Sequence, residues 1–299
     1  MLQTVRVWAT RAYYRRANAR AWRGKFTDAP FSTLQLPGPG GQLQTRVYSS
    51  KQGRDKPLII YFHGGGWVIG DLATHHPFCQ QLREHTGCTV VAVDYRLAPE
   101  HPCPAALDDC LAATRWLAGH VESIGPTNGK FVLAGDSAGG HLAACTALAV
   151  DAALRSRLAG ALLIYPVVDH YSRPYPSYTE RARGQTLTSA LMRWFWDTWL
   201  EGKGADAASA AGAVIAGRPD LSSLPPCLLV TAERDPLRDE GRALGTALEH
   251  AGVDMTQHHY ANAEHGFACS QGPNPDFQHF MALTRQWLDR RAAGRSDAH

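Results

Sequence analysis

Short apolar runs recur along the chain, and they do not alternate with polar positions. They lie at 57–62, 88–94, 130–134, 161–165 and 227–231, and a sixth candidate strand lies at 256–260. Such runs are typical of parallel strands that are covered on both faces. Stretches of helical length fall between them, at 75–86, 105–120, 137–150 and 238–251. This alternation predicts an α/β fold with a mostly parallel central sheet flanked by helices.

Large apolar side chains recur at helical spacing near the end of the chain. Counted from Phe277, the residues at offsets of three, four, ten and eleven are Phe280, Met281, Trp287 and Leu288. These positions share one face of a helix. We therefore expect a final helix that packs on the sheet.

One segment breaks the strand and helix rhythm. Residues 171–216 are aromatic and irregular, with Trp194, Phe195, Trp196 and Trp199 close together. An insertion here would lie above the carboxyl ends of the strands, where α/β sheets bind ligands, so we interpret it as a helical cap. The alternative is that these aromatics are the ordinary core of another helix. On the first interpretation, we expect substrate contacts from tryptophans of the cap and of a glycine-rich loop, namely Trp67, Trp194 and Trp196.

The most informative pattern places a serine between two glycines at a strand-to-helix junction. Gly135-Asp136-Ser137-Ala138-Gly139 follows the apolar run at 130–134 and opens the next helix. A turn this tight strains the serine backbone and leaves no room for a Cβ two residues before or after it. The pentapeptide can arise by chance in a glycine-rich loop, but here both the strand and the helix are present. The pattern predicts that Ser137 is a nucleophile, with helix amides beside its oxygen.

A serine nucleophile needs a base, and the base needs a carboxylate that orients it. Among 14 histidines, we favour His265, because it follows the strand at 256–260 and a glycine comes directly after it. His75 and His76 open a helix, where we expect them to be solvated. For the carboxylate, Asp235 and Glu233 both follow the run at 227–231. Spacing alone leaves these two alternatives open.

A glycine-rich loop follows the first apolar run. His63-Gly64-Gly65-Gly66-Trp67 comes directly after the strand at 57–62. Three glycines allow the backbone to fold back so that its amides face a pocket, where they would stabilise an oxyanion. The alternative is a flexible turn, which Trp67 and the apolar residues after it make less favourable.

Composition narrows the possible partners. The chain has 299 residues, 44% of them hydrophobic, and a net charge of only +3, so we expect one large α/β core and no nucleic-acid partner. Seven scattered cysteines do not indicate a disulfide framework, and no Cys or His spacing indicates a metal site. The first 23 residues contain six arginines but no long apolar stretch, so we expect neither a signal peptide nor stable membrane insertion, and a cytoplasmic location. The alternative is that this basic helix rests on an anionic membrane surface.

Five motifs together resemble the hormone-sensitive lipase family of α/β-hydrolase fold carboxylesterases, and the resemblance spans most of the chain. In chain order they are HGGGW at 63–67, DYRLAPEHPCPAALDD at 94–109, GDSAGG at 135–140, DPLRDEG at 235–241 and HGF at 265–267. The resemblance implies the catalytic triad Ser137, Asp235 and His265. It also implies oxyanion-hole amides from Gly65, Gly66 and Ala138, with Gly64 as a further candidate. It further implies an N-terminal helical cap segment at 1–33 and a cap insertion at 171–216, with the hydrolase core at 34–170 and 217–299.

The same resemblance leads to an expected activity. It implies a serine carboxylesterase that needs no cofactor and works through an acyl-enzyme. The aromatic cap suggests a closed, apolar pocket, so we expect small ester substrates with short to medium acyl chains. One alternative is the same triad acting on amides, lactones or acetylated small molecules, because triad chemistry alone does not set specificity. The other is a ligand-binding protein of the same fold without catalysis. Oligomeric state stays open, with a homodimer as one candidate.

Overall fold

A single mixed sheet forms the centre of the molecule. The structure, a computed structural model, describes residues 2–184 and 186–292. Within these residues the sheet has eight strands in the order β1-β2-β4-β3-β5-β6-β7-β8. From β4 to β8 all neighbours are parallel, and only the pairs β1–β2 and β2–β4 are antiparallel. The strands are β1 (Ser32–Gly38), β2 (Gly41–Tyr48), β3 (Leu58–Phe62), β4 (Val90–Val93), β5 (Phe131–Asp136), β6 (Leu158–Ile164), β7 (Cys227–Arg234) and β8 (Met255–Glu264).

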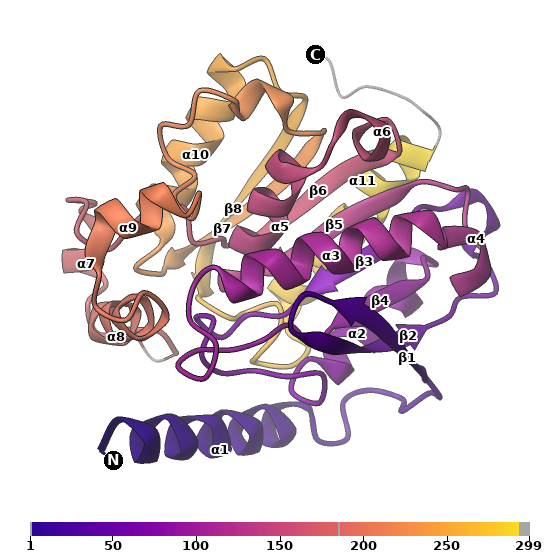
Figure 1. The fold of residues 1–299 in the computed structure, drawn as a ribbon. Coiled ribbons are helices and arrows are strands. Elements are labelled where there is room, and N and C mark those ends of the chain that lie inside the picture. The colour runs from indigo at the N-terminus through magenta and orange to yellow at the C-terminus, as the bar shows by residue number, and fades with distance from the viewer. Residues whose placement is uncertain (1, 185, 293–299) are drawn as a thin grey trace.

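Helices cover both faces of this sheet, as Figure 1 shows. One face carries α3 (Ala105–Gly119), α5 (Ala138–Ala149) and α10 (Arg238–His250). The other carries α2 (His76–Thr86) and α11 (Pro275–Ala292). Short connecting helices are α4 (Val121–Ile124), α6 (Ala152–Arg155), η1 (Gly53–Asp55) and η2 (Leu221–Ser223). The predicted α/β architecture is confirmed, including the final helix.

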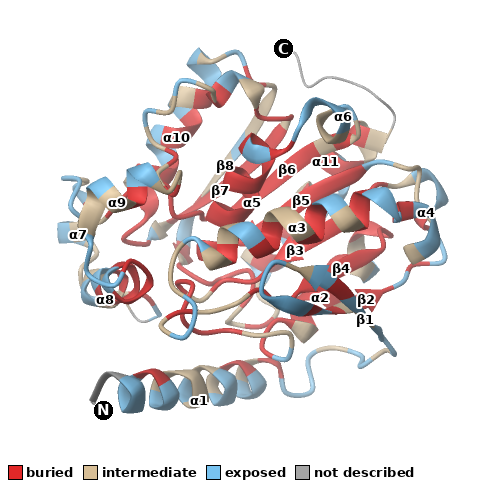
Figure 2. Ribbon diagram, in the orientation of Figure 1, coloured by how far each residue is buried: buried red, intermediate tan, exposed pale blue. Residues whose placement is uncertain are grey.

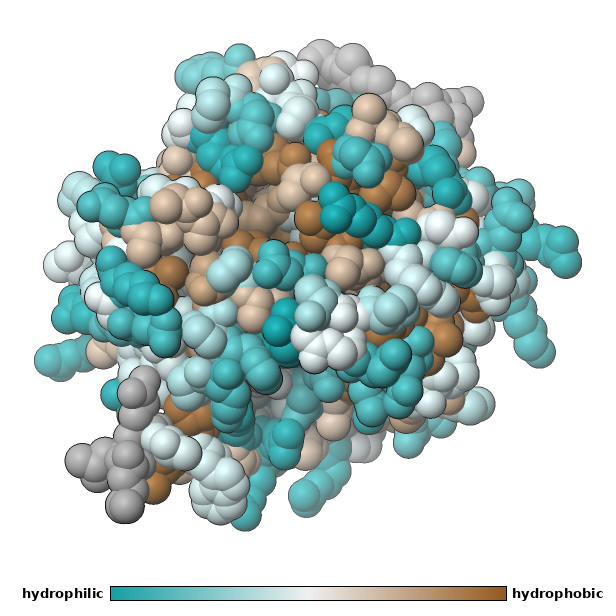
Figure 3. All heavy atoms as spheres, in the orientation of Figure 1, coloured by the Kyte–Doolittle hydropathy of each residue, from teal (hydrophilic) through white to brown (hydrophobic). Residues whose placement is uncertain are grey.

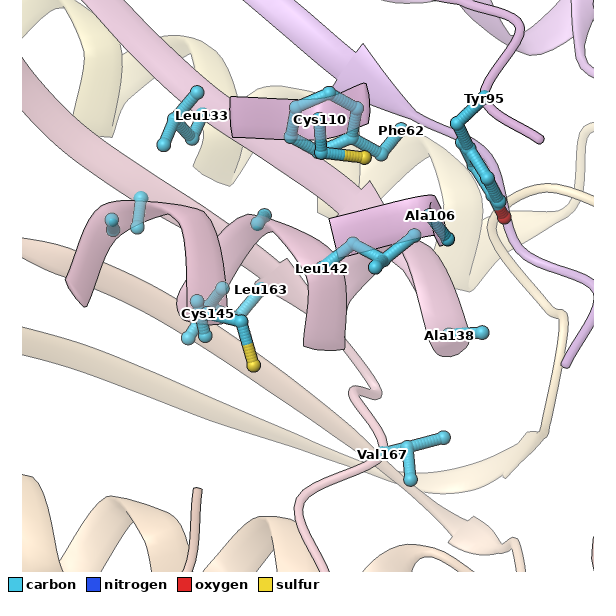
Figure 4. Close-up of a cluster of buried hydrophobic side chains, with 14 of the residues drawn as sticks. Phe62, Tyr95, Ala106, Cys110, Leu133, Ala138, Leu142, Cys145, Leu163 and Val167 are labelled. Atoms are coloured by element: carbon cyan, nitrogen blue, oxygen red, sulfur yellow. The ribbon is translucent and has the colours of Figure 1, made fainter. Parts of the chain in front are cut away.

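The two faces of the sheet have separate apolar cores. Because successive side chains of a strand point to opposite faces, Ile60 and Phe62 of β3 join one cluster, whereas Ile59 and Tyr61 join the other. Figure 4 shows the first cluster, where Leu142 of α5 packs with sheet residues. β3, β4 and β5 are buried along their whole length (Figure 2), whereas polar side chains occupy much of the surface seen in Figure 3. Burial on both faces explains why these three strands carry no polar alternation.

Two groups of helices lie outside these layers. The N-terminal helix α1 (Leu2–Trp22) runs along one edge of the molecule, and α7 (Ser177–Glu180), α8 (Ser189–Trp199) and α9 (Gly204–Ala210) gather at the adjacent end (Figure 1). Arg11 ties α1 to the core by hydrogen bonds to Glu100 and to the Val68 and Ala98 carbonyls. At the other end of the helix, Trp22 Nε1 donates to the Cys269 carbonyl at 2.9 Å. The cap limits 1–33 and 171–216 remain predictions, and β1 already begins at Ser32.

The structure differs from the sequence-based expectations at one hairpin and at one histidine. The β1–β2 hairpin was not anticipated, because its strands have the mixed composition STLQLPG and GQLQTRVY and lie at the exposed end of the sheet. The expectation that His75 is solvated is wrong, since only 1% of it is exposed, and His76 is half-buried. The seven cysteines all lie in the described part of the chain as free thiols.

Candidate active site

The serine lies on a strained turn between β5 and α5. Its backbone has φ 55° and ψ −120°, in the left-handed half of conformational space that non-glycine residues rarely occupy. A Cβ on Gly135 would lie 2.3 Å from the carbonyl carbon of Gly139, and a Cβ on Gly139 would lie 2.0 Å from the Phe62 carbonyl oxygen. Both flanking positions therefore require glycine. The turn holds Ser137 above the carboxyl end of the sheet.

The structure brings the three predicted triad residues together. Ser137 Oγ lies 3.0 Å from His265 Nε2, and His265 Nδ1 lies 2.7 Å from Asp235 Oδ2. Since an ionised carboxylate only accepts hydrogen bonds, Nδ1 carries the proton, and Nε2 is free to accept the proton of the serine. All three side chains are buried, so water competes little for these hydrogen bonds. The arrangement can activate a serine hydroxyl.

The choice between the two carboxylates is made by chain geometry. Asp235 is fully buried, and its Oδ1 accepts from the Leu237 amide at 2.8 Å while Oδ2 faces the histidine. Glu233 lies two residues earlier on β7 and pairs instead with Arg181, Arg238 and His259. Asp235 is thus the carboxylate beside the base, and Glu233 belongs to a surface ion-pair network.

The glycine-rich loop after β3 faces the serine. Gly65 has φ 125° and Gly66 has φ 58°, and both residues line the same cavity as Ser137. The Gly65 carbonyl turns away, because it accepts from the Val68 and Ile69 amides at 3.1 and 2.9 Å. Among the described residues, no hydrogen-bond acceptor occupies the amides of Gly65, Gly66 and Ala138. Three amides are therefore left to stabilise an oxyanion.

The fourth oxyanion candidate is excluded by its own hydrogen bond. The Gly64 amide donates to Asp136 Oδ1 at 2.8 Å, so it is not available to a substrate oxygen. A Cβ on Gly64 would also meet the same carboxylate, at 2.3 Å from Oδ2. Gly64 was only a further candidate, as the first of the three glycines in the loop. The structure shows that the first one anchors the loop.

Asp136 is the centre of a buried network that the sequence reading did not assign. Besides the Gly64 amide, its carboxylate accepts a short hydrogen bond from the Tyr61 hydroxyl, and His75 Nε2 lies 3.4 Å away. Burial by itself raises the pKa of Asp136, but the nearby His75 and the hydrogen bonds from Tyr61 and Gly64 outweigh it and hold that pKa below its usual value. An ionised Asp136 thus joins the turn at Ser137 to the glycine-rich loop.

A cavity of about 180 Å³ opens above the serine. Its walls come from four parts of the chain that are far apart in sequence: α1, the glycine-rich loop, the segment around α8 and the His265 loop. Phe195 of α8 lies directly against the loop, since a Cβ on Gly66 would touch its ring at 2.2 Å. The other wall residues include Tyr13, Tyr14, Asn18, Ile69, Thr186, Leu187, Leu191 and Ser270.

The tryptophans expected to contact substrate do not line this cavity. Trp67 is fully buried and stacks on Trp199 with ring centroids 4.2 Å apart, while Trp196 lies 4.6 Å away. Trp194 is covered by the guanidinium of Arg6, 4.5 Å above its ring. The prediction was wrong because Phe195 takes the inward position on α8. The neighbouring tryptophans instead form the packed junction between cap and core. This agrees with the alternative interpretation, in which these aromatics are ordinary core residues of a helix.

Two buried histidines next to the site have structural contacts. His63 Nδ1 donates to the Gly64 carbonyl, and the His63 ring stacks on Tyr95. His141 accepts from Trp67 Nε1 and donates to the Ala213 carbonyl. Burial lowers the pKa of each to about 4, so both imidazoles are neutral near pH 7. His141 thereby connects the glycine-rich loop to the cap segment.

The fold and the Ser-His-Asp geometry define a serine hydrolase of the α/β type, and comparison with known proteins agrees. A profile described as alpha/beta hydrolase fold matches residues 59–269. Esterase LipI from Mycobacterium tuberculosis is 38% identical over 246 residues, covering 81% of this chain and 76% of that protein. Carboxylesterase NlhH from the same species is 37% identical over 227 residues, covering 75% and 71%. A solved esterase of Pyrobaculum calidifontis superposes with a TM-score of 0.85 at 34% identity, covering 96% and 93%.

These similarities extend well beyond the motifs, because they span most of the chain. The protein belongs to the α/β-hydrolase fold family, in the group of esterases related to hormone-sensitive lipase. No helix in the described ranges is both long and apolar enough to cross a membrane.

Proposed function

We propose that this protein is a serine carboxylesterase that uses Ser137 as nucleophile, His265 as base and Asp235 as orienting carboxylate. The observation that carries the proposal is the continuous pair of hydrogen bonds, 3.0 and 2.7 Å long, from Ser137 through His265 to Asp235. The esterase names of relatives that cover most of the chain support it.

Catalysis would proceed in two steps on this frame. Ser137 Oγ attacks the ester carbonyl carbon while its proton passes to His265 Nε2, and the amides of Gly65, Gly66 and Ala138 stabilise the tetrahedral oxyanion. Collapse breaks the bond to the alcohol, which leaves with the proton from Nε2. Water then attacks the acyl-enzyme with the same base, and the acid is released.

The cavity supports a preference for short to medium acyl chains. Its volume of about 180 Å³ is below the range of roughly 300–1,000 Å³ for pockets that hold drug-sized ligands. Apolar side chains such as Ile69, Leu191 and Phe195 form part of its wall. A series of p-nitrophenyl esters would test this preference, which requires faster cleavage of butyrate than of palmitate.

The decisive experiment combines an active-site label with substrates of different bond types. An organophosphonate should modify Ser137 and stop hydrolysis with one equivalent bound, and Ser137→Ala should abolish both reactions. Parallel assays on an ester, an anilide and a lactone with matched acyl groups should show the ester as the best substrate. Failure of the wild type to react with the phosphonate would favour a ligand-binding protein, and a preferred anilide or lactone would assign a different activity to the same triad.

Two further aspects of the proposal concern context. We place the protein in the cytoplasm, where seven free thiols are compatible with a reducing environment. A homodimer is the assembly to test first, by light scattering at several concentrations. The substrate is a small ester in either case.

A further inference from the structure

Three of the four large hydrophobic side chains that are exposed in the described part of the chain lie on α1. Trp8 and Tyr13 are each 73% exposed and Val5 is 60% exposed. At about 100° per residue, Val5, Trp8 and Tyr13 fall within about 140° of the helix circumference, whereas Val7 lies outside that arc and is buried. Apolar side chains that gather on one exposed face mark a site of interaction, whereas isolated ones do not. Figure 2 shows this helix at the edge of the molecule with exposed positions along its length.

The same face is strongly basic. No acidic residue occurs from the start of the chain to Thr27, and six arginines fall within the first 23 residues. Arg11 and Arg15, on the side near the core, pair with Glu100 and Asp71. Further out, three exposed arginines form no ion pair with any described residue, and they are Arg16, Arg20 and Arg23. Lys25 adds another exposed positive charge just after the helix.

The inward side of this helix is part of the cavity wall. Thr10, Tyr14, Ala17 and Asn18 line the cavity above the serine, and Tyr13 contributes from the border between the two sides. The basic aromatic face and the cavity therefore share one helix. Anything that binds the outer face lies next to the entrance.

We propose that the outer face of α1, formed by Val5, Trp8, Tyr13, Arg16, Arg20 and Arg23, docks on an anionic lipid surface. Tryptophan and tyrosine prefer the boundary between headgroups and acyl chains, and arginines are attracted to the negative potential of anionic lipids. The mode is attachment in the plane of the surface, since no described helix could span a bilayer. An apolar ester dissolved in the lipid would then meet the cavity without crossing bulk water.

Charge decides between a lipid surface and a second copy of this chain. Two copies that met through this face in a twofold dimer would bring their exposed arginines close together with no acid on the helix to balance them. An anionic surface supplies that balance over the whole length of the helix. The proposal does not require the proposed esterase activity, because attachment can be measured without turnover.

The test is sedimentation of the full chain, carrying Ser137→Ala to prevent lipid turnover, with vesicles. The protein should bind vesicles of phosphatidylcholine that contain about 30% phosphatidylglycerol, an anionic lipid. It should not bind vesicles of pure phosphatidylcholine. Raising the salt concentration should weaken binding, because it screens exposed charges. Absence of binding to the anionic vesicles at low salt would overturn the proposal, while intact phosphonate labelling of the wild type would leave the esterase proposal standing.

Variants can show whether binding depends on the outer face of α1 or only on the total positive charge of the protein. Removing three charges with Arg16→Gln, Arg20→Gln and Arg23→Gln should weaken binding about 100-fold, and Trp8→Ala with Tyr13→Ala should weaken it at least about tenfold. The matched control removes three exposed charges elsewhere, with Arg54→Gln, Arg115→Gln and Arg242→Gln. This control should keep most of the affinity. The same three substitutions in a chain that retains Ser137 should hydrolyse a water-soluble ester like the wild type.

Two results would contradict the proposal even if vesicles bind. Equal loss of binding in the control triple variant would show a general charge effect with no defined face. A dimer in solution that Trp8→Ala converts to a monomer would show that a second copy covers the aromatic residues. Trp8 fluorescence, compared between the parent and Trp8→Phe, should shift to the blue on binding if the indole enters the interface.

Discussion

Two regions of the molecule hold their residues in different ways. The triad edge is the carboxyl end of the sheet, where Ser137, Asp235 and His265 lie. The cap junction is the place where aromatic residues pack between the cap and the core. At the triad edge, each functional side chain follows a parallel strand, and backbone geometry fixes it: the strained turn at Ser137, the Leu237 amide on Asp235, and the loop after β8 for His265. At the cap junction, side chains hold each other across distant segments, as with Trp67, His141 and Trp199. The first region performs chemistry and the second sets the space around it. Substitutions in the two regions should therefore have different signatures.

The largest contrast is expected within the triad edge itself. Asp235→Asn should lower kcat by about 10⁴-fold, because an amide in that place favours the wrong histidine tautomer. Glu233→Gln, two residues away, should change kcat by less than about tenfold, since its partners are arginines and His259. Steady-state kinetics on p-nitrophenyl butyrate would measure both. Comparable losses in the two variants would show that the carboxylates share the role.

The second test concerns the connection between the two glycine-containing turns. Asp136→Ala leaves the Gly64 amide and the Tyr61 hydroxyl without their acceptor, so the glycine-rich loop should lose its alignment with Ser137. We expect kcat to fall about 100-fold with little change in KM, as when an oxyanion donor is lost. Asp136→Asn keeps one acceptor oxygen and should recover part of the rate. A loss confined to thermal stability, with kcat unchanged, would contradict a positioning role.

The third test uses pH to examine the cap junction. Burial lowers the pKa of His141 to about 4, against 6.5 for an exposed histidine. Between these values the unfolded chain binds a proton that the folded chain does not, so stability is full above pH 6.5 and falls as pH decreases toward 4. From pH 7.5 to 5.0 the free energy of unfolding should drop by about 2 kcal/mol from this group.

Urea denaturation at the two pH values would measure that drop. In His141→Gln the decrease should be smaller by the same amount, although the variant is less stable at both pH values because Trp67 and Ala213 lose a partner. His120→Gln, at an exposed position, serves as the control and should keep the wild-type pH dependence. An unchanged pH dependence in His141→Gln would mean that the imidazole is not kept neutral by the fold.

The smallest expected effect separates the cavity wall from the packed aromatics behind it. Phe195→Ala enlarges the cavity next to Gly66, so the ratio of kcat/KM for octanoate over butyrate esters should rise by roughly tenfold. Trp199→Phe changes a residue that faces Trp67 and not the cavity, and should reduce stability with the ratio unchanged. A shift in chain-length preference from Trp199→Phe alone would assign specificity to the junction.

Much of this arrangement was readable from the chain. The unbroken apolar runs predicted the parallel strands, and the positions of Ser137 and His265 beside strand ends predicted two members of the triad. The sequence could not choose between Asp235 and Glu233 without a family resemblance, because both follow the apolar run at 227–231. In the structure, Glu233 is still part of β7, whereas Asp235 lies in the loop after it. Nor could it show that Gly64 is occupied by Asp136, since that hydrogen bond joins two turns 72 residues apart.

The sequence by itself determined the nucleophile, because the strained turn that presents Ser137, with glycines on either side and amides beside it, depends on residues that are neighbours in the chain. Tertiary structure alone decided the shape of the cavity. Its walls come from α1, the glycine-rich loop, α8 and the His265 loop, and the rotation of α8 places Phe195 inward and its tryptophan neighbours in the core. A helix that is apolar on several sides does not reveal which side faces a cavity, since that depends on the surfaces against which it packs.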